Sequence, residues 1–223
     1  GSEGAMCGNG VRCAAEFLYT HGVRRDCIRI DTPCAGQRVL HRVGDGLWQV
    51  EMGRFSAAPD AVGAVGLGGG PLLDVPLCAG GRAWRVHCVA VGNPHCVVFT
   101  HEPPPAGAEL AAWGRALGRH PAFPGGINVE FAQPISPTGL AVTVWERGSG
   151  ATLACGTGAC AVAAAAVLTG RCPRGAPILV QLPGGTLEVC VQRDDTVLLT
   201  GDAAATFSGT VLIQPCKAPR GVV

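Results

Sequence analysis

Two short segments of the chain carry the same arrangement of residues. One begins at Cys7 and continues with Gly8–Gly10, and the other begins at Cys155 and continues with Gly156–Gly158. An alanine-rich run that favours a helix follows each triplet. A thiol at a helix start feels the positive end of the helix dipole, so we expect a lowered pKa at both cysteines. The glycines allow backbone N–H groups to approach a bound anion closely. The pattern therefore predicts two reactive thiols, each beside an anion-binding loop.

Two such loops facing each other would place a base and an acid on opposite sides of one carbon atom. Removing a proton from the α-carbon of an amino acid requires a nearby base and stabilisation of the carbanion. Inverting the centre requires a second group that returns a proton from the other face. One cysteine is then a thiolate and the other a thiol, and the roles exchange with the reaction direction. A plain structural role for the loops, as glycine-rich turns before helices, is the alternative.

Polar residues also follow two predicted strands. Asn93 and His95 belong to a Gly-Asn-Pro-His turn, in which His95 relays a proton, orients a thiol or only supports the structure. Glu146 and Arg147 follow the strand that precedes the second cysteine loop. Adjacent side chains of opposite charge suit the amine and carboxylate of a zwitterion, or form an exposed salt bridge.

Composition excludes several classes of function. The 223-residue chain has a formal net charge of +1, which provides no basic surface for nucleic acid. No apolar run reaches the roughly 18 residues that span a bilayer, so we expect no membrane insertion. The only lysine is Lys217, six residues from the end, which argues against a Schiff base with pyridoxal phosphate. We therefore do not expect pyridoxal phosphate as a cofactor.

Twelve cysteines occur, none of them in the C-x-x-C spacing typical of a zinc ribbon or a thioredoxin-like site, so no metal is expected. Cys88, Cys96 and Cys190 lie in apolar runs and are expected to be small buried residues in a reducing compartment.

Hydrophobic periodicity predicts an α+β protein with short strands and few helices. A segment rich in Pro and Gly, residues 54–81, is the expected domain boundary. Residues 44–46 form a Gly-Asp-Gly turn typical of a hairpin. We expect helices at 11–19, 109–117 and 159–169, and strands at 28–32, 37–43, 47–52, 86–91, 96–99, 128–131, 140–145, 178–182, 186–192, 196–200 and 206–213.

Taken together, these motifs resemble the diaminopimelate epimerases. The resemblance extends from the first residues to the last predicted strand, with the motifs in the expected order. The matching segments are M-C-G-N-G-V-R-C (6–13), G-N-P-H (92–95), H-P-x-F-P-x-G-I-N-V-E-F (120–131), W-E-R-G (145–148) and A-C-G-T-G-A-C-A (154–161).

The resemblance implies a fold and an activity. The activity is a cofactor-independent interconversion of LL- and meso-diaminopimelate, which serves lysine and peptidoglycan precursor synthesis. The fold has two pseudo-symmetric domains, each a curved and mostly antiparallel sheet around a central helix. The first domain would comprise residues 1–53 plus 203–217, and the second residues 54–202. A homodimer and a cytoplasmic location, or a plastid in a photosynthetic eukaryote, are further implications.

Carried over by motif, the acid and base are Cys7 and Cys155. Residues that would bind the reacting carboxylate are Gly8, Asn9, Gly156 and Thr157. Residues that would bind the rest of the substrate are Asn93, Asn128, Glu146 and Arg147, with His95 as an auxiliary group.

The chain departs from the family pattern at its start. Family members carry about a further quarter of chain before the first cysteine, with substrate contacts in it. We therefore expect an incomplete first domain, with little epimerase activity and a tendency to aggregate. A second departure is Asp202, where the family usually has proline after Thr200 and Gly201.

Two other functions stay open. A proline or hydroxyproline racemase would also use two thiols as acid and base. Such an enzyme usually has histidine at the position of Asn9 and lacks the Gly-Asn-Pro-His turn. An inactive fragment or thiol-redox protein would use Cys7 and Cys155 as a reversible disulfide.

Overall fold

The computed structural model describes residues 7–32 and 36–212. Cys34, Cys216 and Lys217 lie outside these residues, as do positions 213–217 of the predicted first domain. The helices are α1 (Gly8–Thr20), α2 (Pro59–Val62), α3 (Gly107–Gly118) and α4 (Gly156–Leu168). The strands are β1 (Cys27–Thr32), β2 (Gly36–Gly44), β3 (Leu47–Arg54), β4 (Val75–Ala79), β5 (Arg82–Ala90), β6 (Pro94–Phe99), β7 (Asn128–Ser136), β8 (Gly139–Glu146), β9 (Gly150–Thr152), β10 (Pro177–Leu182), β11 (Gly185–Val191) and β12 (Thr196–Asp202).

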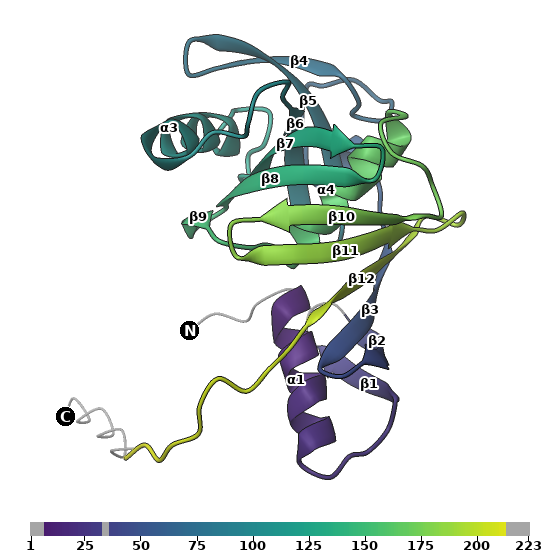
Figure 1. Cartoon of the computed structure of the whole chain (residues 1–223). Helices are drawn as coiled ribbons and strands as arrows, with labels where there is room; N and C mark the ends of the chain where they lie inside the picture. Colours follow the sequence, from purple (N-terminus) through teal and green to yellow (C-terminus); the bar gives the residue numbers. More distant parts are fainter. Residues whose placement is uncertain (1–6, 33–35, 213–223) are drawn as a thin grey trace, which may run out of the picture.

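The strands form one long, curved sheet (Figure 1). Its order is β1-β2-β3-β12-β11-β10-β8-β7-β6-β5-β4, and β9 pairs with β8. Neighbouring strands are antiparallel except for the β6–β7 and β8–β10 pairs, which are parallel. A large sheet with few helices confirms the predicted α+β class.

The helix α4 is the centre of the larger part of the molecule. Figure 1 shows it behind β7, β8 and β10, and it packs on seven strands from β5 to β12. Every residue from Gly156 to Ala166 is buried. A helix that is apolar on all sides belongs in a core. Its alanines are small, so strands can approach it closely from several directions.

The helix α1 covers the other end of the sheet. It packs on β3 and β12 through Val11 and Ala15. Trp48 on β3 is fully buried beneath it, and the indole Nε1 donates a hydrogen bond to Glu16 Oε2 at 2.7 Å. The two ends of the sheet are joined where β12 pairs with β3, from Thr196↔Arg54 to Asp202↔Leu47, with a register shift between Val197 and Leu198. The division into domains at residues 54 and 202, which are the ends of these strands, stays a prediction.

The predicted helices are all present, and each begins two or three residues earlier than expected. Two strands were missed. One is β4, inside the segment rich in Pro and Gly, and the other is the three-residue β9.

The strand predicted at 206–213 is wrong over the residues that the structure describes. Residues 206–212 form no strand. Phe207 and Leu212 are 88% and 92% exposed, so their side chains bury almost no apolar surface. Alternating apolar residues become a strand only when a neighbouring strand completes the ladder.

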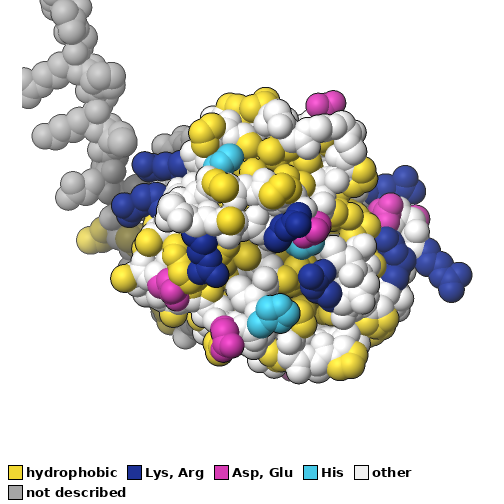
Figure 2. Space-filling view, turned by 90° about the horizontal axis from the view of Figure 1, so that it is seen from above, with side chains coloured by type: hydrophobic (Ala, Val, Ile, Leu, Met, Phe, Trp, Pro, Cys, Tyr) yellow, Lys and Arg dark blue, Asp and Glu magenta, His cyan; other side chains and the backbone are white. Residues whose placement is uncertain are grey.

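Charged side chains are dispersed over the face seen in Figure 2, where arginines stand apart among apolar and neutral atoms. Within residues 7–32 and 36–212, no helix has the length and apolar character needed to cross a membrane.

The packing of α3 on β8 provides a test of the fold. A Cβ added to Gly114 would lie 2.5 Å from Trp145 Cβ and Cγ. Gly114→Ala should therefore lower the free energy of unfolding by about 1–3 kcal/mol, although alanine favours helix formation. The measurement is urea unfolding followed by circular dichroism. Ala112→Leu adds volume on the exposed side of α3 and should change stability by less than about 0.5 kcal/mol. A more stable Gly114→Ala variant would contradict this packing.

Candidate active site

The two cysteine loops have nearly identical backbones. Cys7 is the N-cap of α1, with φ −132° and ψ 103°, and Cys155 is the N-cap of α4, with φ −134° and ψ 113°. Each sulfur accepts a hydrogen bond from the N–H three residues later, at 3.2 Å from Gly10 and 3.3 Å from Gly158. A Cβ at either glycine would lie 3.3 Å from that sulfur. The glycine at this position therefore leaves the thiol uncrowded.

The two helix starts meet directly. A Cβ on Gly156 would lie 3.4 Å from Gly8 Cα, and a Cβ on Gly8 would lie 3.6 Å from Gly156 Cα. The same added Cβ atoms would lie close to Leu199 Cδ2 on β12, at 3.2 Å for Gly156 and 2.9 Å for Gly8. Glycine at both positions is what permits this approach. The positive ends of the two helix dipoles thus meet at one site, and each carries its cysteine.

Anion-binding groups remain free at this junction. In α1 the N–H of Gly10 bonds to the Cys7 sulfur and the N–H of Val11 to the Cys7 carbonyl. The same two bonds occur in α4. Helix starts leave their first N–H groups unsatisfied. Within the described part of the chain, four N–H groups consequently make no hydrogen bond, those of Gly8, Asn9, Gly156 and Thr157.

The two thiols have different surroundings. Cys7 is exposed, whereas Cys155 is 7% exposed. Burial raises the pKa of Cys155 to about 12, and the negative charge of Glu130 adds to the rise. Hydrogen bonds from Thr157 Oγ1, at 3.4 Å, and from the Gly158 N–H act in the opposite direction. The lowered pKa expected at Cys155 is thus wrong, because desolvation outweighs the helix start.

A buried arginine holds the first loop in place. Arg12 is 4% exposed, and its guanidinium donates to the carbonyl of Gly8 and to Asn9 Oδ1, both at 3.1 Å. Its Nε donates to the carbonyl of Asp202 at the end of β12, at 3.4 Å. Arg12 was not among the site residues predicted from the sequence. The sequence feature that could have identified it is a charged residue in helical phase with Val11 and Ala15, on the buried side of α1.

A second cluster lies at the beginning of β6. His95 and Glu130 are both fully buried, with His95 Nδ1 2.7 Å from Glu130 Oε1. The other ring nitrogen lies 2.9 Å from Asn93 Oδ1. Glu130 was part of a matched motif, but sequence reasoning gave it no role. The close approach of Glu130 to Gly158 brings this cluster beside Cys155.

Asn128 connects two predicted substrate-binding turns. Its Nδ2 donates to the carbonyl of Pro94 at 2.9 Å, and its Oδ1 accepts from the backbone N–H of Arg147 at 2.8 Å. The side chain therefore fixes the turn that carries Asn93 against the turn that carries Glu146.

The side chains of Glu146 and Arg147, which are adjacent in sequence, bond to different parts of the structure. Glu146 Oε1 accepts from Thr152 Oγ1 at 2.6 Å, and its charge contributes to the raised pKa of Cys155. The guanidinium of Arg147 is exposed and donates to the carbonyls of Gly125 and Gly126. Among the ion pairs of the described residues there is none between Glu146 and Arg147. The charge of Glu146 thus acts on the thiol, whereas Arg147 bonds to another loop.

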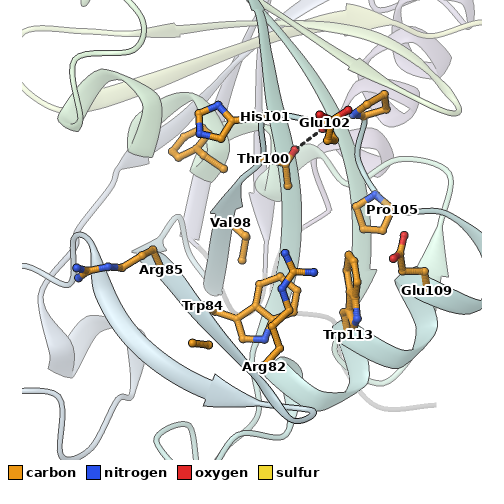
Figure 3. A pocket seen from close by; sticks show the side chains of 13 residues that line it. Arg82, Trp84, Arg85, Val98, Thr100, His101, Glu102, Pro105, Glu109 and Trp113 are labelled. Atoms are coloured by element: carbon orange, nitrogen blue, oxygen red, sulfur yellow. Dashed lines mark hydrogen bonds between the residues drawn. The ribbon is translucent and has the colours of Figure 1, made fainter.

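A separate hollow of about 500 Å³ opens elsewhere on the surface (Figure 3). The guanidinium of Arg82 stacks on Trp84 and Trp113 within it, at 4.4 Å and 4.7 Å. The hollow is lined by the first residues of β5 and the last of β6, whereas His95 lies near the start of β6. It therefore lies at the far end of these strands from the cysteine junction.

Comparison with known proteins identifies the family. The sequence model described as diaminopimelate epimerase matches residues 87–206. The diaminopimelate epimerase of Synechococcus sp. (strain JA-2-3B'a(2-13)) is 47% identical over 224 residues, which cover 94% of this chain and 74% of that protein. Diaminopimelate epimerase 1 of Nostoc sp. (strain PCC 7120) is 45% identical, with 94% and 75% covered. The chain belongs to the diaminopimelate epimerase family. It is thus a member of a family of isomerases, and it spans about three quarters of the length of these relatives.

Solved structures share the fold at lower identity. A probable proline racemase from Agrobacterium radiobacter K84 matches 95% of this chain and 69% of its own, with a TM-score of 0.68 at 17% identity. A hydroxyproline epimerase from Agrobacterium vitis has a TM-score of 0.66 at 18% identity, with 89% and 64% covered. These likenesses concern the fold alone.

The Arg12 bonds predict a specific effect of substitution. Arg12→Lys removes the fork that reaches Gly8, Asn9 and Asp202 at once, and a point charge cannot replace it. We expect the free energy of unfolding to fall by about 1–3 kcal/mol. The rate at which Cys7 is alkylated should also change, because Arg12 no longer holds the loop that carries this cysteine. Chemical unfolding and site-resolved mass spectrometry measure both quantities. Arg29→Lys, at an exposed position, is the control, and equal behaviour of the two variants would contradict the role of Arg12.

Proposed function

We propose that the protein is a cofactor-independent epimerase that interconverts LL- and meso-diaminopimelate through Cys7 and Cys155. Membership of the family supports the substrate. The observation that carries the mechanism is the meeting of two cysteine-capped helix starts at Gly8 and Gly156. The reaction would serve lysine and peptidoglycan precursor synthesis.

The reacting α-carboxylate would bind to the free N–H groups of Gly8, Asn9, Gly156 and Thr157. A carboxylate at two helix starts receives charge-assisted hydrogen bonds and the favourable field of both dipoles. The same field stabilises the carbanion, whose negative charge spreads onto the carboxylate as the proton leaves.

Proton transfer would then proceed between the two thiols. In one direction Cys7 is the thiolate and takes the α-proton, while the Cys155 thiol delivers its proton to the opposite face. The reaction ends with Cys7 as the thiol and Cys155 as the thiolate, and the reverse reaction restores the first state. The burial of Cys155 supports its role as the proton donor in this direction.

The remaining predicted residues would hold the rest of the substrate. Asn93 bonds to His95, Asn128 bonds to Pro94, and Glu146 bonds to Thr152. All three side chains would contact the amino groups or the distal end. Arg147 would join them only after leaving its bonds to Gly125 and Gly126. A homodimer and a cytoplasmic location belong to the same proposal by analogy with the family.

Incubation with diaminopimelate in heavy water tests the function against its rivals. An epimerase incorporates deuterium at the α-carbon, whereas a thiol-redox protein does not. Proline in the same assay separates the racemase alternative. If the 223-residue chain is too slow to measure, the test is repeated with the N-terminal part of the Synechococcus relative fused to it.

Both thiols should be required for turnover. Cys7→Ala and Cys155→Ala should each lower kcat about 10²–10⁴-fold or more, because the base and the acid act as a unit in both directions of the reaction. The measurement is epimerisation followed by the approach to isomer equilibrium. Cys190→Ala, a thiol on β11, is the matched control and should keep nearly full activity. Near-normal turnover of either first variant would reject the assignment.

Oxidation should join the two thiols. Groups that flank one carbon atom lie close enough for a small closure to bring them within disulfide range. We expect air oxidation to abolish activity, reductant to restore it, and peptide mapping to find a Cys7–Cys155 crosslink. Two free thiols in an oxidised, inactive sample would be the opposite result.

A further inference from the structure

Glu130 is a buried acid that the proposed mechanism does not use. It lies on β7, next to β6, with α4 packed on both strands (Figure 1). Its side chain is fully buried, and His95 is its only hydrogen-bond partner in the described part of the chain, at 2.7 Å. The second oxygen, Oε2, is buried without a partner. Leaving a buried carboxylate oxygen unsatisfied is costly, so its presence calls for a reason.

Gly158 connects this acid to the thiol. The position of a Cβ on Gly158 would lie 2.7 Å from Glu130 Oε1 and 3.3 Å from Cys155 Sγ. The N–H of the same glycine donates to that sulfur at 3.3 Å. The missing side chain therefore lets the carboxylate approach the thiol across a single backbone residue.

We propose that Glu130, oriented by His95, is a positioning residue that keeps Cys155 in its protonated, proton-donating form. A negative charge beside a thiol disfavours the thiolate, which would add a second negative charge in a dry environment. The proposal rests on the proposed function for its catalytic meaning, but its effect on the thiol is measurable without turnover.

Several groups act on the ionisation of Glu130 and Cys155. Burial raises the pKa of Glu130 and works against its negative charge, whereas the hydrogen-bonded His95 ring acts in the opposite direction and favours the carboxylate. Glu146 acts on the pKa of both Glu130 and Cys155 in the raising direction. Several other titratable or charged groups act on Glu130, on His95 or on the Cys155 thiol. They come from four elements: His95 and Cys96 from β6, Glu146 from β8, Cys155 and Cys160 from α4, and Arg12 from α1. Arg12 acts through Cys160.

The Glu130 carboxylate beside Cys155 explains how one element, used twice, takes two roles. Cys7 and Cys155 have matching caps and matching backbone angles, so the loops alone do not decide which one donates the proton. Cys7 is exposed, whereas Cys155 has Glu130 behind it. The carboxylate behind Cys155 thus assigns the proton in the free enzyme.

The test measures the thiol itself, in the full chain with Cys7→Ala to remove the competing group. Cys155 is alkylated with iodoacetamide at a series of pH values, and its peptide is quantified by mass spectrometry. The parent should show a pH midpoint above that of an ordinary thiol, about 8.5. Glu130→Gln should move the midpoint down and raise the rate at neutral pH on the order of tenfold, since one pKa unit is a tenfold change in thiolate.

Two controls separate charge from packing. Glu130→Asp keeps the charge and should stay near the parent midpoint. Glu109→Gln, in the distant hollow of Figure 3, removes an unrelated carboxylate and should change nothing.

Each outcome decides the proposal. Coincident profiles of Glu130→Gln and the parent would overturn it, and so would a parent midpoint below about 8.5, which needs no substitution at Glu130. If the midpoint shifts as expected while the fusion with the N-terminal part of the Synechococcus relative, with Cys7 intact, fails to exchange the α-hydrogen of diaminopimelate, the proposed function falls but the role of Glu130 on the thiol stands. In an active enzyme, Glu130→Gln should lower kcat with little change in KM and displace the pH profile to lower pH.

Discussion

The contact between the two helix starts is the constraint on which the site depends. Gly8 and Gly156 approach so closely that any side chain at either position would press on the other backbone and on Leu199. Leu199 belongs to β12, which pairs with β3 and packs on both α1 and α4. The sheet is therefore continuous across the junction, which fixes two helices from distant parts of the sequence end to end. Their unpaired N–H groups and both cysteines then converge.

A repeated sequence element gives two chemically different thiols because the surroundings differ. The loops supply the same cap, the same N–H bond to sulfur and the same glycine spacing. Cys155 is enclosed by the core around α4, with Glu130 and Glu146 nearby, whereas Cys7 is exposed. Desolvation and neighbouring carboxylates act over the whole buried environment, and they outweigh the local benefit of a helix start. Asymmetry of this kind suits a reaction that needs one acid and one base.

Much of the fold followed from local patterns. The cysteine-glycine triplets marked the starts of α1 and α4, and alternating apolar residues marked most strands. The failures were those where local pattern and tertiary pairing disagree. β4 forms within a segment rich in Pro and Gly because β5 offers it a partner, whereas residues 206–212 alternate well and form no strand without one.

The site was predicted less completely than the fold, for a related reason. Cys7, Cys155 and the glycines carry their signal in their own spacing. Arg12 and Glu130 act through partners that are remote in sequence, since Arg12 bonds to Asp202, 190 residues away, and Glu130 to His95, 35 residues away. A charged residue in an apolar pattern is a warning of such a role, but only the folded chain identifies the partner. The predicted pKa of Cys155 was wrong for the same reason, because burial is a property of the assembled core.

The central claim is that two separate groups act on opposite faces of one carbon atom. Its most direct test is the isotope distribution at early times in heavy water, starting from a single diaminopimelate isomer. Two thiols of the proposed kind predict that the product isomer carries solvent deuterium while the unreacted isomer keeps its hydrogen. Deuterium that appears in both isomers at equal rates would mean that one group serves both faces, which would contradict the two-thiol mechanism.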